Sequence, residues 1–195
     1  MSGLRLVLAS ASPRRHALLA QIGFSAVETA TPDIDEAPRK DESPRELARR
    51  LAHAKAAAIA IPGAHILSAD TVVACGRRIL PKAETEAQAR ACLTLLSGRR
   101  HRVITAVVLR LPDGTADGIM RERIVESAVG FARLTDQQIA AYLTSGEWHG
   151  KAGGYAIQGM AAGFIRFLSG SYSNVVGLPL YETAQLLRGA GWTIP

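Results

Sequence analysis

The stretch LRLVLASASPRRHALLAQIG (residues 4–23) places a short apolar run, a polar turn and a helical pattern directly after one another. The apolar residues 4–9 predict a strand that is buried on both faces. Ser12-Pro13 is typical of a helix N-cap followed by proline at the first helical position, so we expect a helix over residues 13–21. The segment therefore predicts a strand that leads through a polar turn into a helix.

Paired arginines stand where this helix is expected to begin. The macrodipole of a helix disfavours positive charge at its N-terminus, so Arg14 and Arg15 need an explanation. One interpretation is that both side chains are solvated and Ser12 only caps the helix. The other is an anion cradle, in which the Ser10 and Ser12 hydroxyls, free backbone N–H groups and two guanidinium groups bind a phosphate. A bound phosphate would remove the conflict with the helix dipole.

Similar capping signals precede the later helices. Residues 43–46, Ser-Pro-Arg-Glu, are a capping box that opens an alanine-rich helix reaching about Ile61. Thr85 and Thr135, each followed three residues later by Gln, open two more helices. The other expected elements are strands at 25–30, 65–76, 77–80, 102–111, 115–134 and within 164–179, a hairpin turn at 112–114, and a closing helix at 179–189.

The mixture of strands and helices, with a hairpin among them, predicts an α/β fold with a mixed sheet rather than an all-parallel one. The length of 195 residues suits one sizeable domain, so we expect residues 1–195 to form a single domain without a separable linker. No apolar run is long enough to span a bilayer, and the first apolar stretch is too short for a signal peptide. We therefore expect a cytoplasmic protein with no membrane partner.

The composition also disfavours several kinds of site. Cys75 and Cys92 form no C-x-x-C pair and the five histidines have no metal-ligand spacing, so we expect reduced thiols and no zinc site. The net charge of +6 fits an anionic ligand, yet aromatic residues make up only 5% and offer little for stacking nucleobases. The charge therefore favours a small phosphate-bearing ligand, and we expect no specific nucleic-acid partner.

Two acidic features are candidates for chemistry. Residues 33–36, Asp-Ile-Asp-Glu, bring three carboxylates together, which a hard divalent cation such as Mg²⁺ would offset; a solvated acidic loop is the alternative. Asp70 lies inside an apolar strand, where burying a carboxylate is costly unless it is paired or binds a metal. The alternative for Asp70 is a buried side chain that caps a turn.

Lysines and a glutamine complete the candidates. Lys55 lies among alanines in a predicted helix, Lys82 follows a short strand, and Lys151 and Gln158 belong to the glycine-rich segment KAGGYAIQG. Each lysine taken alone is more often a solvated surface residue than part of a site. The motifs of P-loop proteins, dinucleotide-binding folds and serine hydrolases are absent from the sequence. Carboxylates combined with arginines and lysines instead favour metal-assisted phosphoryl chemistry.

Several segments taken together resemble the Maf family of nucleoside triphosphate pyrophosphatases. In chain order they are LASASPRRHALLAQIG, PDIDE, LAHAKA, ADTVV, LSGRRHRVITAV, KAGGYAIQG and GSYSNVVGLPL. The resemblance covers nearly the whole chain and implies a mixed, strongly twisted sheet with flanking helices that form two lobes around a deep cleft, similar to inosine triphosphate pyrophosphatases. It also implies a cytoplasmic enzyme that uses Mg²⁺ or Mn²⁺. Members of the family often dimerise, so a homodimer is one expected assembly.

The implied reaction is hydrolysis of a nucleoside triphosphate between the α- and β-phosphates, a house-cleaning activity that yields the monophosphate and pyrophosphate. By motif, Asp70 would be the general base, and Glu36 and Asp70 would hold the metal. The positions that would bind the substrate are Ser10, Arg14, Arg15, Lys55, Thr71, Lys82 and Gln158. Of these, the resemblance implies that Arg14, Thr71 and Gln158 select the substrate.

The segment KAGGYAIQG is similar to the branch of the family that acts on dTTP and UTP. The amide of Gln158 matches the O4 and N3–H edge shared by thymine and uracil, and 5-methyl-UTP or pseudo-UTP would present the same edge. The chain departs from the family at residues 81–83, Pro-Lys-Ala, where the usual motif is GKP. The alternative function is a non-catalytic nucleotide-binding regulator of cell division, because the family is associated with inhibition of septum formation.

Overall fold

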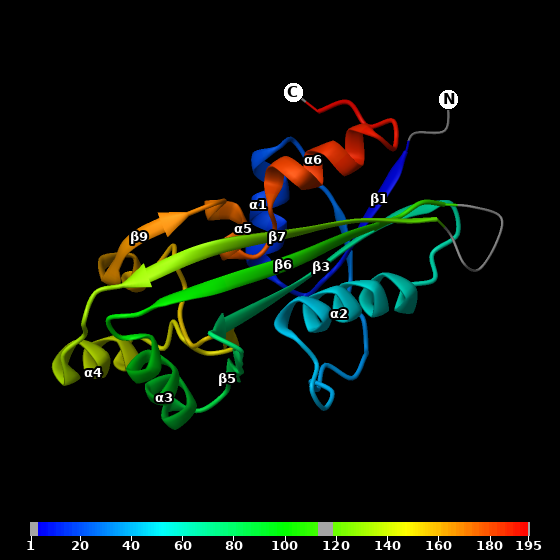
Figure 1. Ribbon diagram of the computed structural model, residues 1–195. Helices are drawn as coiled ribbons and strands as arrows, with labels where there is room; N and C mark the ends of the chain where they lie inside the picture. Colours follow the sequence, from blue (N-terminus) through cyan, green and yellow to red (C-terminus); the bar gives the residue numbers. More distant parts are fainter. Residues whose placement is uncertain (1–3, 113–118, 195) are drawn as a thin grey trace.

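The computed structural model describes residues 4–112 and 119–194, and its main feature is one mixed sheet (Figure 1). The strand order is β2-β1-β3-β6-β7-β9, with β4 paired to β3. These strands are β1 (Arg5–Ala9), β2 (Glu28–Ala30), β3 (Ala64–Cys75), β4 (Arg78–Leu80), β6 (Arg100–Arg110), β7 (Met120–Phe131) and β9 (Ile165–Ser169). Because β1 runs parallel to β2 and β3 while the other pairs are antiparallel, the expected mixed sheet is confirmed.

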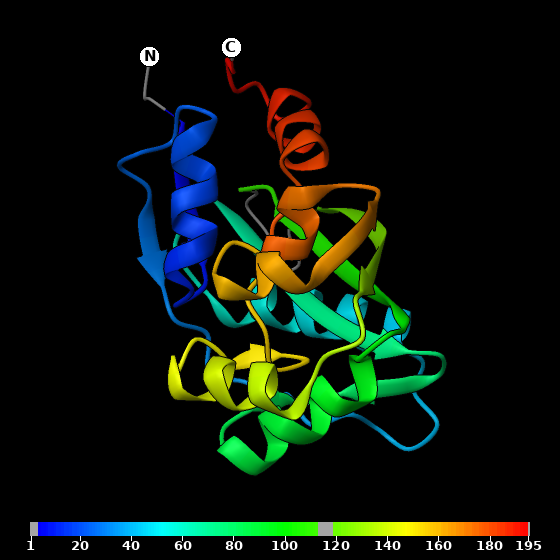
Figure 2. The same ribbon diagram turned by 90° about the vertical axis from the view of Figure 1, so that its left-hand side faces the viewer.

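Helices cover both faces of this sheet. They are α1 (Pro13–Gln21), α2 (Pro44–Ala58), α3 (Glu86–Leu96), α4 (Asp136–Thr144), α5 (Tyr172–Val176), α6 (Leu180–Arg188) and the 3-10 helix η1 (Met160–Phe164). In Figure 1, α2 lies on one face and α1, α5 and α6 lie on the other. The view in Figure 2 separates the part built on α1 and α6 from the part built on α3 and α4. A small second sheet of β5 (Lys82–Ala83) and β8 (Lys151–Ala152) belongs to the latter part.

The sequence of α2 explains how it meets the sheet. Leu47, Leu51 and Lys55 recur every four residues and therefore share one face of the helix, which is buried. Ala48, Ala52 and Ala56 lie beside this stripe and are fully buried, and such small side chains allow a helix to pack closely on a sheet. The buried face contacts β3 and β6. This packing brings the ammonium group of Lys55 into the interior.

The central strand β3 has one open stretch along its edge. Its pairing with β1 ends at Leu67, its pairing with β4 begins at Val73, and β6 pairs with the other edge. Residues 68–72 therefore have no neighbouring strand on the β1 side among the residues described. Because adjacent side chains of a strand point to opposite faces, Asp70 faces α2 and Thr71 faces α1. Both residues therefore lie at the same open edge of the sheet.

The helix starts were predicted more accurately than the helix ends. The capping boxes of α2, α3 and α4 form as expected, each with both reciprocal hydrogen bonds. Ser12 occupies the N-cap position of α1, but its hydroxyl makes no capping hydrogen bond. The helix expected to reach Ile61 ends at Ala58, because Ile59 adopts an extended conformation and packs its side chain into the core.

Other boundaries differ from the expectations. The strand expected at 25–30 is confined to β2, and the strand expected at 115–134 runs from Met120 to Phe131. Most of the expected hairpin turn, Asp113 and Gly114, lies outside the described residues, as do residues 115–118. The short helix α5 was not expected. No helix in the described part of the chain is long and apolar enough to cross a membrane.

Candidate active site

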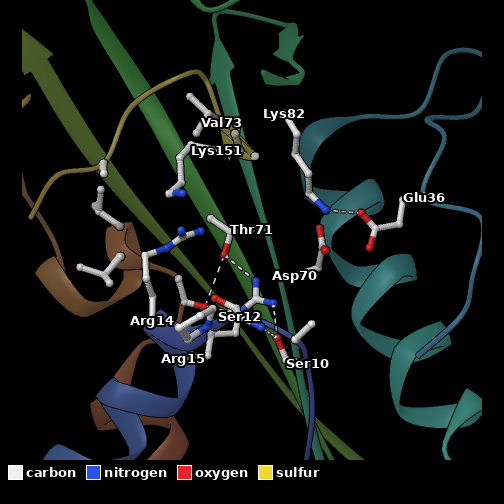
Figure 3. Close-up of a pocket in the computed structure, with 18 of the residues that line it drawn as sticks. Ser10, Ser12, Arg14, Arg15, Glu36, Asp70, Thr71, Val73, Lys82 and Lys151 are labelled. Carbon is white, nitrogen blue, oxygen red and sulfur yellow. Dashed lines mark hydrogen bonds and ion pairs between the residues drawn. The ribbon is translucent and has the colours of Figure 1, made fainter. Parts of the chain in front are cut away.

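A cavity of about 350 Å³ lies at the carboxyl ends of β1 and β2, beside the open edge of β3. Its wall includes every residue predicted from the sequence to act in catalysis, substrate binding or metal binding. These residues are Ser10, Arg14, Arg15, Glu36, Lys55, Asp70, Thr71, Lys82 and Gln158. They come from the β1–α1 turn with the first turn of α1, the loop after β2, α2, β3, β5 and the loop after β8. The fold therefore brings all nine positions together, and Figure 3 labels all of them except Lys55 and Gln158.

An ion-paired cluster forms one side of the cavity. The Lys55 Nζ atom lies 2.6 Å from Asp70 Oδ1 and 2.7 Å from Glu36 Oε1, and the ammonium group of Lys82 pairs with the other oxygen of Glu36. The side chains of Lys55 and Asp70 are only 7% and 4% exposed, so each would be costly to bury alone. The pairing explains how α2 and β3 tolerate these two charges in their interface.

Glu36 connects the two lysines of this cluster. Burial raises the pKa of its carboxyl group, but hydrogen bonds and charge from Lys55 and Lys82 outweigh burial and lower the pKa to about 2. Asp33 and Asp35 in the same loop are exposed and do not line the cavity. Asp35 instead accepts a hydrogen bond from the backbone N–H of Ala37. Of the three acidic residues at positions 33–36, all of them in the described part of the chain, Glu36 alone lines the cavity.

Arg15 is held mainly by the protein itself. Its guanidinium donates from Nε to the Gly177 carbonyl at 2.8 Å, from Nη2 to Thr71 Oγ1 at 3.2 Å and from Nη1 to Ser10 Oγ at 3.3 Å. Burial lowers its pKa, while the charge of Asp70 opposes that effect. Arg15 therefore links α1 to the end of α5, and among the described residues two of its five N–H groups have no partner and are left for a ligand.

Arg14 contrasts with its neighbour. Its side chain makes no hydrogen bond or ion pair with any residue that the structure describes, although burial lowers the pKa of its guanidinium. A partly buried guanidinium without a partner is unfavourable, since burying a charge costs free energy unless it is compensated. The interpretation of solvated arginines at this helix start therefore fits Arg14 and Arg15 less well than an anion cradle does.

A buried network behind Thr71 was missed by the sequence reasoning. The hydroxyl of Thr71 lies 2.9 Å from that of Thr105 on β6, which donates to the Asn174 carbonyl in α5. The Asn174 side chain donates to the Val103 carbonyl and to Ser127 Oγ. This network fixes α5, whose C-cap residue Gly177 supplies the carbonyl that binds Arg15. Ser171, three residues before Asn174, caps α5 and was the available sequence signal.

The glycine-rich loop that carries Gln158 is also anchored. The Tyr142 hydroxyl accepts from the Ala156 backbone N–H, and the Tyr155 hydroxyl lies 2.7 Å from His101 Nε2. Burial lowers the pKa of His101 to about 4, which keeps this buried imidazole neutral at pH 7. Gln158 itself is exposed at the cavity wall. The anchored backbone holds its amide in reach of a ligand.

The departure at residues 81–83 leaves Lys82 at the cavity. The Pro81 carbonyl accepts from the Gly153 N–H at 3.0 Å, and the Ala83 carbonyl accepts from the Gly150 N–H at 2.9 Å. These two bonds tie both flanking residues to the glycine-rich segment. Lys82 is thereby held next to Glu36, with its side chain 47% exposed toward the cavity.

The residues present also fit a hard divalent cation. Asp70 and Glu36 direct one carboxylate oxygen each at a single cationic position, which the Lys55 ammonium group fills. Among residues 4–112 and 119–194, no cluster of three or more His, Cys, Asp or Glu side chains could hold a metal ion. Two carboxylates suffice for Mg²⁺, which usually binds one or two carboxylates together with substrate phosphates and water.

Comparisons with known proteins give matches over nearly the whole chain. Residues 5–190 match the family model described as Maf-like protein. A dTTP/UTP pyrophosphatase of Granulibacter bethesdensis is 64% identical over 96% of this chain and 93% of its own length. Another, of Novosphingobium aromaticivorans, is 60% identical over 95% and 92%. The solved structure of a HAM1 protein from Coxiella burnetii covers 96% of this chain and 100% of its own with a TM-score of 0.54, and at 16% identity it supports the fold alone.

Proposed function

Since the chain belongs to the Maf family, we propose that it hydrolyses dTTP and UTP between the α- and β-phosphates, releasing the nucleoside monophosphate and pyrophosphate. The observation that carries this proposal is the cavity, in which a buried carboxylate lies within one pocket with five cationic side chains. Relatives named dTTP/UTP pyrophosphatase, similar over nearly their full length, supply the reaction and the base preference.

In the proposed mechanism Asp70 takes a proton from a water molecule that attacks the α-phosphorus in line with the leaving group. Lys55 holds the carboxylate of Asp70 in position through their short ion pair. Arg14, the two free N–H groups of Arg15, and Lys82 bind the phosphates and offset the charge that develops on the pyrophosphate. Ser10 holds Arg15 in place.

A divalent cation, Mg²⁺ or Mn²⁺, held by Glu36 and Asp70 would supply charge neutralisation at the phosphates. The protein places the Glu36 carboxylate, from the loop after β2, and the Asp70 carboxylate, from β3, next to the same point in the cavity. Lys55 contacts both carboxylates, so the side chain that holds Asp70 also brings a positive charge to the place proposed for the phosphates.

Base selection is assigned to Gln158, with Arg14 and Thr71 as the other selecting positions. A primary amide donates and accepts at once, so it can pair with the O4 and N3–H of uracil or thymine. Cytosine reverses this pattern with an amino group and an unprotonated N3. We therefore propose that 5-methyl-UTP and pseudo-UTP, which keep the uracil edge, are also substrates.

The direct test is a panel of nucleoside triphosphates with Mg²⁺, followed by separation of the products. We expect UTP and dTTP to yield UMP or dTMP and pyrophosphate, with CTP and GTP hydrolysed at least about tenfold more slowly. Release of a nucleoside diphosphate and phosphate would contradict the proposed bond. Saturable binding of UTP without turnover would support a nucleotide-binding regulator instead.

A cell-based experiment addresses the remaining expectations from the family. We propose that the chain acts in the cytoplasm, that it forms a homodimer, and that its excess inhibits septum formation. Overproduction of the wild type and of Asp70→Asn separates catalysis from binding: filamentation with the wild type alone would tie the effect to turnover. Filamentation with both would favour a regulator.

A further inference from the structure

The charged side chains of the cavity are unevenly paired. Its wall carries five lysine or arginine side chains, which are Arg14, Arg15, Lys55, Lys82 and Lys151, and only two carboxylates, Glu36 and Asp70. Both carboxylates are engaged by Lys55 and Lys82 on one side of the cavity. The other three cations, Arg14, Arg15 and Lys151, form no ion pair with either of these carboxylates. The excess positive charge therefore lies on the side of the cavity opposite Glu36 and Lys82.

Lys151 is the cation on that side that the proposed function does not use. It lies on β8, where it pairs with Ala83, and its Nζ donates a 2.9 Å hydrogen bond to the carbonyl of His149. Burial lowers the pKa of Lys151, the positive charge of Arg14 lowers it further, and Glu147 and Glu84 oppose these effects. No ion pair of Lys151 is formed within the described part of the chain.

The guanidinium group of Arg14 lies near the ammonium group of Lys151 (Figure 3). Figure 3 shows the ends of Arg14 and Lys151 directed toward each other across the cavity, with Glu36 and Lys82 on the far side of Thr71. The two cations come from α1 and from β8, which belong to different parts of the fold. Two like charges that approach each other in a partly buried cavity repel, and a shared anion would remove the repulsion.

We propose that Lys151 and Arg14 together form a binding subsite for one phosphate group. This inference rests on the proposed function, because it assigns part of the same substrate. A phosphate oxygen can accept charge-assisted hydrogen bonds from a guanidinium and an ammonium group at once. Lys151 thereby becomes a substrate-binding residue, and the phosphate joins the α1 side of the cavity to the β8 side.

The test measures binding of two separate ligands, pyrophosphate and UMP, by titration calorimetry in the presence of EDTA. The variants are Lys151→Met, Lys151→Arg and the control Lys40→Met, which removes the same charge from an exposed loop outside the cavity. We expect Lys151→Met to lower the affinity for one of the two ligands by about tenfold or more, which is the effect expected when a charge-assisted hydrogen bond is lost. Lys151→Arg should recover most of the affinity, and Lys40→Met should change it less than about twofold.

The ligand whose affinity falls in Lys151→Met shows which phosphate of the substrate occupies the subsite. Weaker pyrophosphate binding would place the β- or γ-phosphate at the subsite, and weaker UMP binding would place the α-phosphate there. Affinities for both ligands within about twofold of the wild type would overturn the proposal. An equal loss in Lys40→Met would also overturn it, because the effect would then come from net charge.

A double variant separates a shared ligand from a structural effect of Lys151 on its turn. If Arg14 and Lys151 bind the same phosphate, the losses in Arg14→Ala and Lys151→Met should not add in the double variant. Additive losses would contradict a shared subsite. Because these measurements need no turnover, they stand apart from the proposed reaction: a wild type that binds through Lys151 but leaves UTP intact refutes the hydrolase and keeps the subsite.

Discussion

Asp70 and Thr71 are neighbours in the sequence that serve opposite faces of the sheet. The alternation of β3 directs Asp70 to Lys55 on α2 and Thr71 to Arg15 on α1. Both reach one cavity because the pairing of β3 with β1 ends at Leu67. Residues 69–71, Ala-Asp-Thr, therefore connect the Lys55 side of the site to the Arg15 side, because adjacent side chains of the strand alternate in direction.

The first prediction concerns Asp70. The Asp70→Asn variant keeps nearly the same shape but cannot accept the proton, so turnover of UTP should fall by about a hundredfold or more. The measurement is kcat with UTP and Mg²⁺, with circular dichroism as the control for folding. A folded variant that retains near-wild-type kcat would show that another group is the base.

The second prediction compares the two adjacent arginines. Arg15→Ala removes hydrogen bonds to Gly177, Ser10 and Thr71, so it should lower the free energy of unfolding by about 1–3 kcal/mol. Arg14→Ala removes no bond to any residue that the structure describes, so it should leave stability nearly unchanged while raising KM for UTP about tenfold or more. Chemical denaturation and steady-state kinetics on the two variants give both quantities. Equal losses of stability would contradict the different roles assigned to them.

At the level of elements, the glycine-rich segment depends on close packing against β3. Gly153 has a φ of +70°, and a Cβ at this position would lie 2.9 Å from Val73 Cγ1. Gly146 has a similar φ of +71° but open space around it. The two glycines thus share the backbone requirement for a left-handed conformation and differ in the contact.

The third prediction uses this difference. Gly153→Ala should lower the free energy of unfolding by about 1–3 kcal/mol more than Gly146→Ala, because only the former adds overpacking to backbone strain. It should also raise KM for UTP, since Gln158 follows in the same loop. Denaturation curves of both variants provide the comparison. Losses of equal size would mean that the contact with Val73 relaxes without cost.

The elements that the sequence predicted well are those with local signals. Ser43, Thr85 and Thr135 begin helices whose caps depend on residues three positions apart. The pairing of β5 with β8 had no such signal, because two-residue strands lack a hydrophobic period and join segments far apart in the chain. The hydrogen bond from Arg15 to the Gly177 carbonyl could not be predicted from the sequence either, since it depends on the position of α5.

At the level of the whole molecule, Glu36 joins separate parts of the fold. Its two oxygens pair with Lys55 on α2 and Lys82 on β5, so it connects the central sheet layer to the part built on α3 and α4. The sequence identified the residue through the acidic loop. The contacts of Glu36 with Lys55 and Lys82 could not be predicted, because they depend on the fold, which places the acidic loop between the two lysines.

The fourth prediction is a pH dependence of this connection. The folded-state pKa of Glu36, about 2, lies below its ordinary value of 4.5, so its ion pairs stabilise the protein above about pH 4.5. That contribution should be lost progressively as the pH falls from about 4.5 toward 2. The measurement is the difference in free energy of unfolding between the wild type and Glu36→Gln across this range. A difference that stays constant would contradict the assignment.

The nine predicted site residues meet in one cavity although they come from six separate segments. The motifs shared with the Maf family selected these residues, and the acidic loop and the carboxylate inside an apolar strand were independent signals from charge alone. The pairing among them could not be predicted, since it depends on distances across the cavity. Lys151 was noticed in the sequence, but only the structure shows that it forms no ion pair with the residues described.

The most direct test of the central claim is hydrolysis of UTP with Mg²⁺ in ¹⁸O-labelled water, followed by mass spectrometry of the products. Attack of water on the α-phosphorus predicts that the label appears in UMP and that pyrophosphate remains unlabelled. Label in pyrophosphate would place the attack on the β-phosphorus, and formation of UDP would place the cleavage at another bond. Either result would contradict the proposed chemistry of Asp70 in this cavity.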